Sequence, residues 1–140
     1  TQLQDPALKR AIAQDCTQLI DRQVSAKGGL SGIALKGAYR VVKGIGANYV
    51  QGAVERLLPE TGQALEPLWS EGVQKGDPVA HLSAERDRAA DLILQTTDRR
   101  IARAGNAVLS GVYNKLRKSV KPDVVAAVPE LAQTLKKHLN

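Results

Sequence analysis

Apolar residues recur at helical spacing in two separate parts of the chain. In the first part, one side of a helical projection holds Leu35, Ala38, Tyr39, Val42 and Ile45, and the opposite side holds Lys36, Arg40 and Lys43. In the second part, the same stripe is formed by Leu109, Val112, Tyr113, Leu116 and Val120. Strict alternation of apolar and polar residues, which is typical of half-buried strands, does not persist anywhere. The pattern predicts an all-α fold.

The two stripes belong to an internal repeat with an offset of 74 residues. Six residues of the first half recur in the second: Leu35, Gly37, Tyr39, Val50, Ala53 and Val54 return as Leu109, Gly111, Tyr113, Val124, Ala127 and Val128. After a contraction of four residues, Pro59, Glu60, Gln63 and Leu65 return as Pro129, Glu130, Gln133 and Leu135. A looser match at an offset of 77 pairs Asp21-Arg22 with Asp98-Arg99. We therefore expect a helical bundle built from two repeated helical units with internal pseudo-two-fold symmetry.

Length and turn-forming residues set the expected domain organisation. A chain of 140 residues is one domain of ordinary size, whereas each half alone would be marginal. We expect a single domain over 1–140, with unit one at about 5–71, a linker at about 72–78 and unit two at about 79–139.

Proline, aspartate and glycine mark the expected helix boundaries. Asp5-Pro6 and Asp77-Pro78 are typical helix starts, with aspartate as N-cap and proline at the first helical position. The first helix is expected over 6–26, ended by Gly28-Gly29, with Ser31 capping the next.

Two pairs of equivalent residues inside these helices carry further expectations. Pro59 and Pro129 are expected to kink their helix or to begin a new one. Gly37 and Gly111 lie where glycine costs about 1 kcal/mol relative to alanine, so we expect two backbones to approach closely there.

Charge is concentrated in two stretches of the chain. The net charge is +6, and no acidic residue occurs between Asp21 and Glu55 or between Asp98 and Asp123. The candidate anion-binding surface comprises Arg99, Arg100, Arg103, Arg117, Lys118, Lys43 and Arg40. Such a surface would attract duplex nucleic acid or an acidic membrane surface. The same residues also fit an ordinary solvated helix face.

No grouping of residues demands catalysis. Cys16 lies on an apolar stripe and is expected to be a buried thiol. His81 stands four residues before Glu85, which fits a surface pair, and His138 suits the end of a helix. We therefore expect no enzyme activity, no catalytic residue, no cofactor and no metal site. The sequence holds no apolar run long enough for a transmembrane segment and nothing like a signal peptide, so we expect a cytoplasmic protein.

Several short motifs resemble a known family. They are Gly29-Leu30-Ser31-Gly32, Lys36-Gly37-Ala38-Tyr39, Val42-Lys43, Leu57-Leu58-Pro59-Glu60 and Leu65-Glu66-Pro67. Together they resemble a family of small all-helical bacterial proteins of unknown function, mainly over residues 27–69. The resemblance implies a bacterial, cytoplasmic, helical protein and no particular chemistry.

Two functional hypotheses follow from the sequence. The first is a non-enzymatic helical interaction module that self-associates or binds another protein through an apolar groove between the repeats. Aromatic side chains often anchor such interfaces, and Tyr49 and Trp69 are the candidates. The alternative is a basic module that binds an anionic partner, either duplex nucleic acid or an acidic membrane surface.

Overall fold

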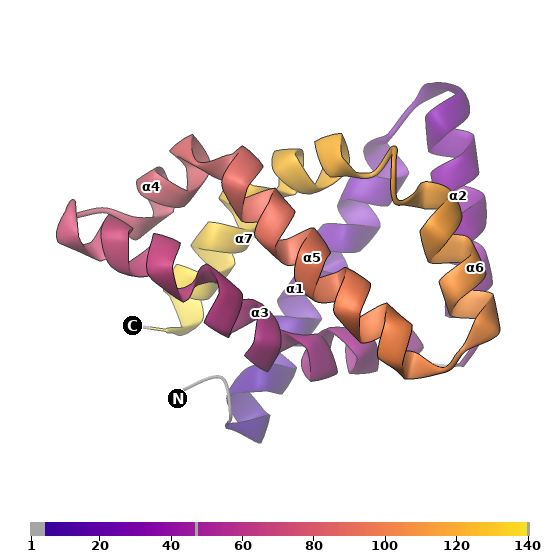
Figure 1. Cartoon of the computed structure of the whole chain (residues 1–140), viewed down its shortest axis with the longest axis horizontal. Coiled ribbons are helices and arrows are strands. Elements are labelled where there is room, and N and C mark those ends of the chain that lie inside the picture. The colour runs from indigo at the N-terminus through magenta and orange to yellow at the C-terminus, as the bar shows by residue number, and fades with distance from the viewer. Residues whose placement is uncertain (1–4, 47, 140) are drawn as a thin grey trace.

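The computed structural model describes residues 5–46 and 48–139 and is all-helical (Figure 1). Over these residues the chain forms seven helices and no strand. The helices are α1 (Pro6–Ala26), α2 (Gly29–Lys43), α3 (Tyr49–Gln74), α4 (Pro78–Ala84), α5 (Arg86–Ala104), α6 (Ala107–Leu116) and α7 (Lys121–His138). The prediction of an all-α fold is confirmed.

Aspartate and asparagine caps begin three of the helices. The Asp5 carboxylate accepts a hydrogen bond from the Ala7 amide at 3.0 Å, and Asp77 accepts one from Ala80 at 3.0 Å. Asn106 caps α6 through the Leu109 amide. The prediction that Ser31 caps the second helix is wrong. Because Gly29 adopts a left-handed conformation with φ of +72°, the chain turns there, and α2 already begins at that residue.

The long helices run through their prolines. Pro59 lies inside α3 and Pro129 inside α7, so neither residue begins a new helix. α3 continues to Gln74, so the first residues of the linker expected at about 72–78 are helical. Gly72 is buried, and a Cβ added there would lie 2.5 Å from the Cα of Pro78. The connection between α3 and α4 is therefore a tight, packed corner.

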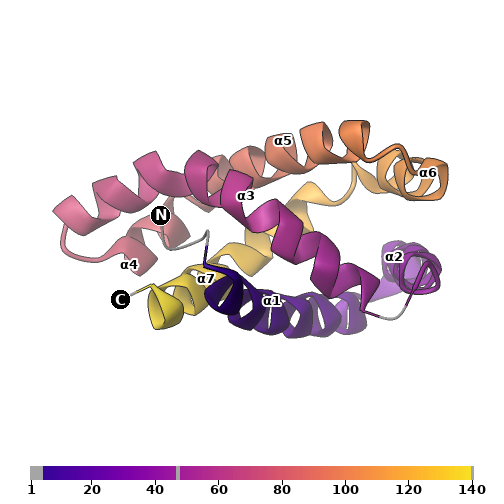
Figure 2. The ribbon, with the colours of Figure 1, turned by 90° about the horizontal axis from the view of Figure 1, so that it is seen from below.

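Five helices form what we call the body: α1, α3, α4, α5 and α7 (Figure 2). Within it, α1 and α5 each pack against both α3 and α7. The hydrophobic core draws on all five helices and is aliphatic. Its fully buried side chains include Ile12, Leu68, Leu82 and Val128, and Cys16 lies among them as expected.

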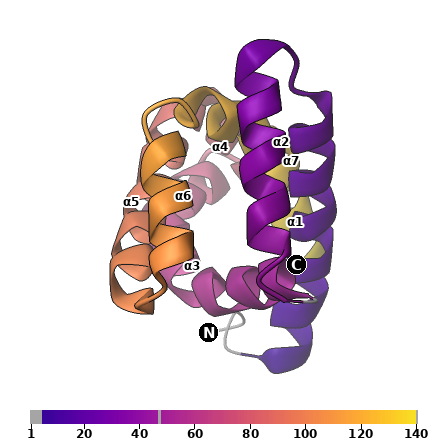
Figure 3. The ribbon, with the colours of Figure 1, turned by 90° about the vertical axis from the view of Figure 1, so that its right-hand side faces the viewer.

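The two remaining helices, α2 and α6, lie side by side and antiparallel at one end of the molecule, and we call them the α2–α6 layer (Figure 3). Neither helix contributes a residue to the core cluster of the described chain. The predicted close approach of backbones at Gly37 and Gly111 is wrong, since a Cβ at either glycine would meet nothing within 4 Å. Both glycines therefore lie beside open space.

Candidate functional site

The α2–α6 layer is attached to the body by two tyrosine–aspartate pairs. In the first, the Tyr39 hydroxyl of α2 donates to the Asp21 carboxylate of α1 at 2.5 Å. Lys43 lies 3.8 Å from the same carboxylate and stands over the Tyr39 ring. Burial and the hydrogen bond to Asp21 raise the pKa of Tyr39, so this hydroxyl keeps its proton and remains a donor.

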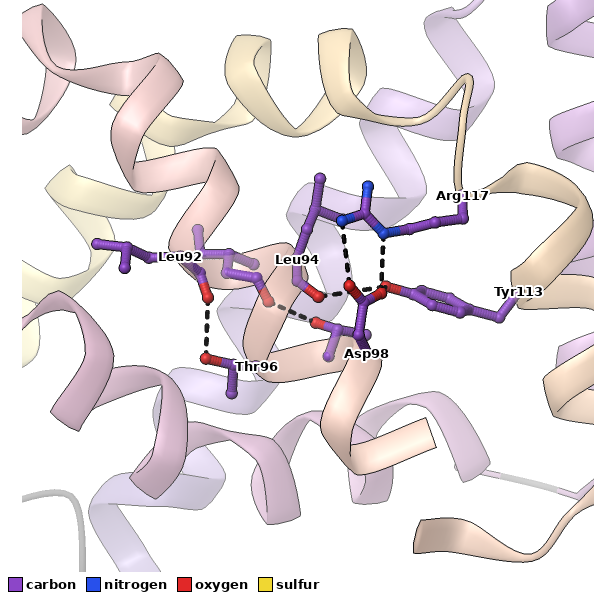
Figure 4. Close-up of polar contacts among 8 residues, drawn as sticks. Leu92, Leu94, Thr96, Asp98, Tyr113 and Arg117 are labelled. Atoms are coloured by element: carbon purple, nitrogen blue, oxygen red, sulfur yellow. Dashed lines mark hydrogen bonds and ion pairs between the residues drawn. The ribbon is translucent and has the colours of Figure 1, made fainter. Parts of the chain in front are cut away.

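The second pair holds α6 on α5 (Figure 4). The Tyr113 hydroxyl donates to Asp98 at 2.5 Å, and the Arg117 guanidinium donates to both oxygens of Asp98 at 2.8 and 3.1 Å. This bidentate contact holds the pKa of Asp98 below its usual range, while burial raises the pKa of Tyr113. We call the Tyr39–Asp21 and Tyr113–Asp98 pairs the latches.

A groove runs between the two helices of the layer, with a volume of about 580 Å³. Its α2 wall consists of Ser31, Ile33, Ala34, Leu35, Gly37, Ala38 and Val41. Its α6 wall consists of Val112, Lys115 and Leu116, and the groove is closed by Ser119, Val120, Lys27 and Asp123. Lys27, which follows α1, and Asp123 of α7 form an ion pair at 2.5 Å. The groove is thus mainly aliphatic, with one lysine on a wall and a neutralised pair at its end.

The α2–α6 layer also carries most of the large hydrophobic side chains that the described chain leaves in contact with solvent. Leu30, Ile33 and Val41 of α2 are 86%, 69% and 48% exposed, and Val108 of α6 is 54% exposed. Among the described residues of the body, only Val73 is comparable, at 57%. The apolar surface of the molecule is therefore gathered at one end, in and beside the groove.

The structure separates the residues of the predicted anion-binding surface into two groups. Arg100 and Arg103 reach the Glu60 carboxylate at 3.8 and 2.7 Å, and Arg117 is held by Asp98. Lys43 shares Asp21 with Tyr39. The other three, Arg40, Arg99 and Lys118, are exposed and make no ion pair with any residue that the structure describes. Much of the predicted surface is therefore already engaged by the chain's own carboxylates.

The anchoring side chains predicted from the aromatic content lie away from the groove. Trp69 packs against the core and lines a crevice between α3 and α7 with Leu65 and Leu135. Tyr49 begins α3 and lies beside Tyr39 in a shallow depression. Their role at an interface stays a prediction.

The predicted apolar stripes supply part of the groove, because Leu35, Ala38, Val112, Leu116 and Val120 line it, whereas Ile33 and Val41 were not predicted to do so. Leu30, Ile33, Gly37 and Val41 recur at intervals of three and four residues along α2 and form a second stripe beside the predicted one. The signal was present, because a helix with apolar residues on two adjoining faces has more apolar surface than one neighbour can cover.

The polar groups elsewhere form structural pairs. His81 bonds to Glu71 of α3 at 3.0 Å, and Glu85 instead lies 3.7 Å from Arg88, so the expected pairing of His81 with Glu85 is wrong. The His81 ring faces Glu71 because α4 packs against α3. His138 bonds to Asp15 at 2.7 Å. Burial raises the pKa of Cys16 to about 11, which keeps the thiol protonated and unreactive. Among residues 5–46 and 48–139, no cluster of three metal-binding side chains occurs.

Comparison with known proteins adds a family and no chemistry. No helix in the described part of the chain combines the length and apolar character needed to cross a bilayer. Neither a curated protein nor a solved structure matches the sequence. A family model described as a family of unknown function, DUF6918, matches residues 1–139. The chain therefore belongs to the DUF6918 family.

Proposed function

We propose that this protein is a non-enzymatic helical interaction module and that its α2–α6 layer is the surface that binds a protein partner. One observation carries the proposal: the two helices that add nothing to the core cluster enclose an aliphatic groove of about 580 Å³ and hold four of the large exposed hydrophobic side chains. Exposed apolar patches of this kind are typical of binding surfaces. The body supplies the stability that such a surface cannot supply for itself.

A protein partner fits this layer better than nucleic acid does. Recognition of duplex DNA depends on many cations that contact phosphates, and Arg100, Arg103 and Arg117 of the predicted anion-binding surface already bind Glu60 and Asp98. This leaves Arg40, Arg99 and Lys118 without a carboxylate partner among the described residues. The middle of the layer is instead aliphatic, which suits the apolar face of another helix.

We further infer that the chain arose as two copies of one helical unit, related by a pseudo-two-fold axis. The latches support this inference, because Tyr39 and Tyr113 are separated by 74 residues and Asp21 and Asp98 by 77 residues. Two ion pairs across the body also resemble each other, because each joins an arginine of one helix to a glutamate of another. Arg22 of α1 reaches Glu130 of α7, and Arg100 of α5 reaches Glu60 of α3. Such a duplication places α2 beside α6 and thereby creates the groove.

A cross-linking experiment tests the proposed function. A photo-reactive amino acid replaces Ile33, Val41 or, as a control of similar exposure in the body, Val73. We expect a discrete cross-linked adduct with a partner protein when the photo-reactive residue replaces Ile33 or Val41, and none when it replaces Val73. The captured protein is then purified, and its affinity is measured for the wild type and for the double variant Ile33→Ser, Val41→Ser. Equal affinity for both would overturn the proposal.

Chromatography with light scattering tests the competing functions. The protein is run alone and with duplex DNA at about 50 and 300 mM salt, a range over which phosphate contacts weaken sharply. We expect no shift with DNA at either salt. A salt-sensitive complex that requires Arg99 and Lys118 would instead favour nucleic-acid binding. A stable dimer that Ile33→Ser, Val41→Ser dissociates would identify self-association as the role of the layer.

A further inference from the structure

We propose that the partner of the α2–α6 layer is an amphipathic helix with acidic residues on both sides of its apolar stripe. This inference rests on the proposed function and deepens it by stating the chemistry of the partner. Two properties of the layer carry it: the shape of the groove and the sign of the charges along its edges.

The shape of the groove suits a helix. On α2 its wall extends from Ser31 to Val41, which spans about 15 Å at the helical rise per residue. A helix of about three turns has this length and places three or four apolar side chains along it, at intervals of three and four residues. Gly37 lies in the middle of this wall with open space above its Cα, so a side chain of the partner fits there.

The charges along the groove have one sign. Neither α2 nor α6 contains an aspartate or glutamate. Lys36 and Arg40 lie beside the exposed stripe of α2, while Lys115 lines the α6 wall and Lys118 follows it. These four side chains are exposed, and none forms an ion pair with another described residue. The acidic residue that does line the groove, Asp123, is neutralised by Lys27.

Charge complementarity therefore selects an acidic partner. Carboxylates on either side of an apolar stripe would meet Lys36 and Arg40 beside the exposed stripe of α2 and Lys115 on the α6 wall, with Lys118 in the turn that follows α6. A second copy of this layer would instead set these cations against one another, which disfavours self-association at this face.

A lipid surface fits less well than an acidic helix. Helices that lie in a membrane interface combine leucine with aromatic anchors such as tryptophan and phenylalanine on one continuous apolar face. The exposed apolar side chains here are aliphatic, and both tyrosines of the layer donate to carboxylates of the body. The surface is also hollowed between its helices, whereas a bilayer favours a continuous apolar face.

The chain provides a matched pair of variants that close the groove or leave it open. Gly37→Leu places a side chain in the groove, and Gly111→Leu places the same side chain at the equivalent position of α6, which does not line the groove. Neither added Cβ meets an atom within 4 Å, so both variants are expected to fold. Circular dichroism and thermal melting verify that they do.

A second pair of variants separates local charge from net charge. The first replaces Lys36, Arg40, Lys115 and Lys118 with glutamine. The control replaces four exposed basic residues away from the layer, namely Arg10, Lys75, Arg86 and Lys136, so both proteins lose the same charge. A long-range effect of net charge would weaken binding equally in the two proteins.

The experiment is a selection from a library of helical peptides with a fixed aliphatic stripe. The positions on either side of the stripe vary equally among glutamate, lysine and glutamine, and the wild-type protein is the target. We expect enrichment of glutamate on both sides. The affinity of the selected peptides should fall at least about tenfold in Gly37→Leu and in the groove charge variant, and should be retained in Gly111→Leu and in the control.

The other outcomes have distinct meanings. Peptides that depend on an open groove but carry lysine or glutamine would overturn the acidic partner and leave the proposed function standing. If no selected peptide binds the wild type more tightly than it binds Gly37→Leu, both the acidic partner and the proposed function are overturned. Vesicles containing phosphatidylserine are tested in parallel, and binding that Gly37→Leu abolishes would overturn the acidic helix in favour of a lipid surface.

Discussion

The body and the α2–α6 layer use similar aliphatic residues for opposite purposes. In the body, Ile12, Leu68 and Leu82 are completely buried among five helices. In the layer, Leu30 and Ile33 are 86% and 69% exposed. Hydrophobic stabilisation scales with the apolar area removed from water, so the layer gains little of it. The latches add polar contacts that join the layer to the body.

This difference separates stability from recognition within one small domain. Substitutions in the body should change the free energy of unfolding, and should affect binding only through the fraction of the protein that is folded. Substitutions in the layer should change binding while the domain stays folded. The following predictions test that division, beginning with the largest expected effect.

Truncating a core leucine should be far more damaging than truncating an exposed isoleucine. Leu68→Ala leaves a cavity at a site with no exposure, so we expect a loss of about 2–5 kcal/mol in the free energy of unfolding. Ile33→Ala removes a side chain that is 69% exposed, and we expect a change within about 0.5 kcal/mol. Urea denaturation followed by circular dichroism measures both. Similar losses would mean that the layer is as well packed as the body.

Alanine should destabilise the protein at the buried Gly72 and stabilise it at the open Gly111. In Gly72→Ala the new Cβ would lie 2.5 Å from the backbone of Pro78, so the corner must shift, at a cost of about 1–3 kcal/mol. In Gly111→Ala the Cβ meets nothing within 4 Å, and helix propensity should stabilise the protein by about 0.5–1 kcal/mol. Thermal denaturation distinguishes these signs. Destabilisation by Gly111→Ala would mean that another part of the protein packs against α6 at this position.

Removing a latch should loosen the layer more than the body. Tyr113→Phe deletes the hydroxyl that donates to Asp98, at a cost of about 1 kcal/mol. Because the lost bond joins α6 to α5, amide hydrogen exchange should accelerate in α6 while the amides around Leu68 keep their protection. Tyr39→Phe provides the equivalent test for α2. Uniform acceleration over the whole chain would contradict a separately anchored layer.

Acid should weaken the second latch by a small amount. Arg117 holds the pKa of Asp98 below that of an unfolded aspartate, about 3.9. The carboxylate therefore stabilises the fold above about pH 4, and this contribution is lost as the pH falls through the lower pKa of the folded state. Asp98 is partly exposed, so screening limits the effect to a few tenths of a kcal/mol.

The pH dependence is isolated by comparing the wild type with Asp98→Asn. Urea denaturation between about pH 6 and pH 3 should show a stability difference that shrinks at the acid end. Asp87→Asn serves as the control, since Asp87 is exposed and no ion pair involves it among the described residues. A difference that does not change with pH would show that the charge of Asp98 is not what matters.

Much of the helical framework could be predicted from local chemistry. Asp5 and Asp77 cap helices as expected because an aspartate followed by proline favours a helix start whatever lies nearby. Cys16 was correctly predicted to be buried from its position on an apolar stripe. These inferences succeed because capping and helical periodicity depend on residues close together in sequence.

The inferences that failed depend on distant neighbours. Gly37 and Gly111 suggested a close approach of backbones, but open space surrounds both. His81 pairs with Glu71 rather than with Glu85, because the fold of α4 onto α3 decides which carboxylate is nearest. The sequence predicted an apolar groove between the repeats, yet it could not place that groove for the same reason: two apolar faces on α2 do not indicate which one the body covers.

The position of the chain's one tryptophan gives the molecule an internal optical reference. Trp69 packs on the body between α3 and α7, while Tyr39 and Tyr113 belong to the latches. Tryptophan emission should therefore report the melting of the body and stay constant when a ligand occupies the groove. Tyrosine absorbance should respond to events in the layer. Unlabelled protein thus offers separate spectral channels for unfolding and for recognition.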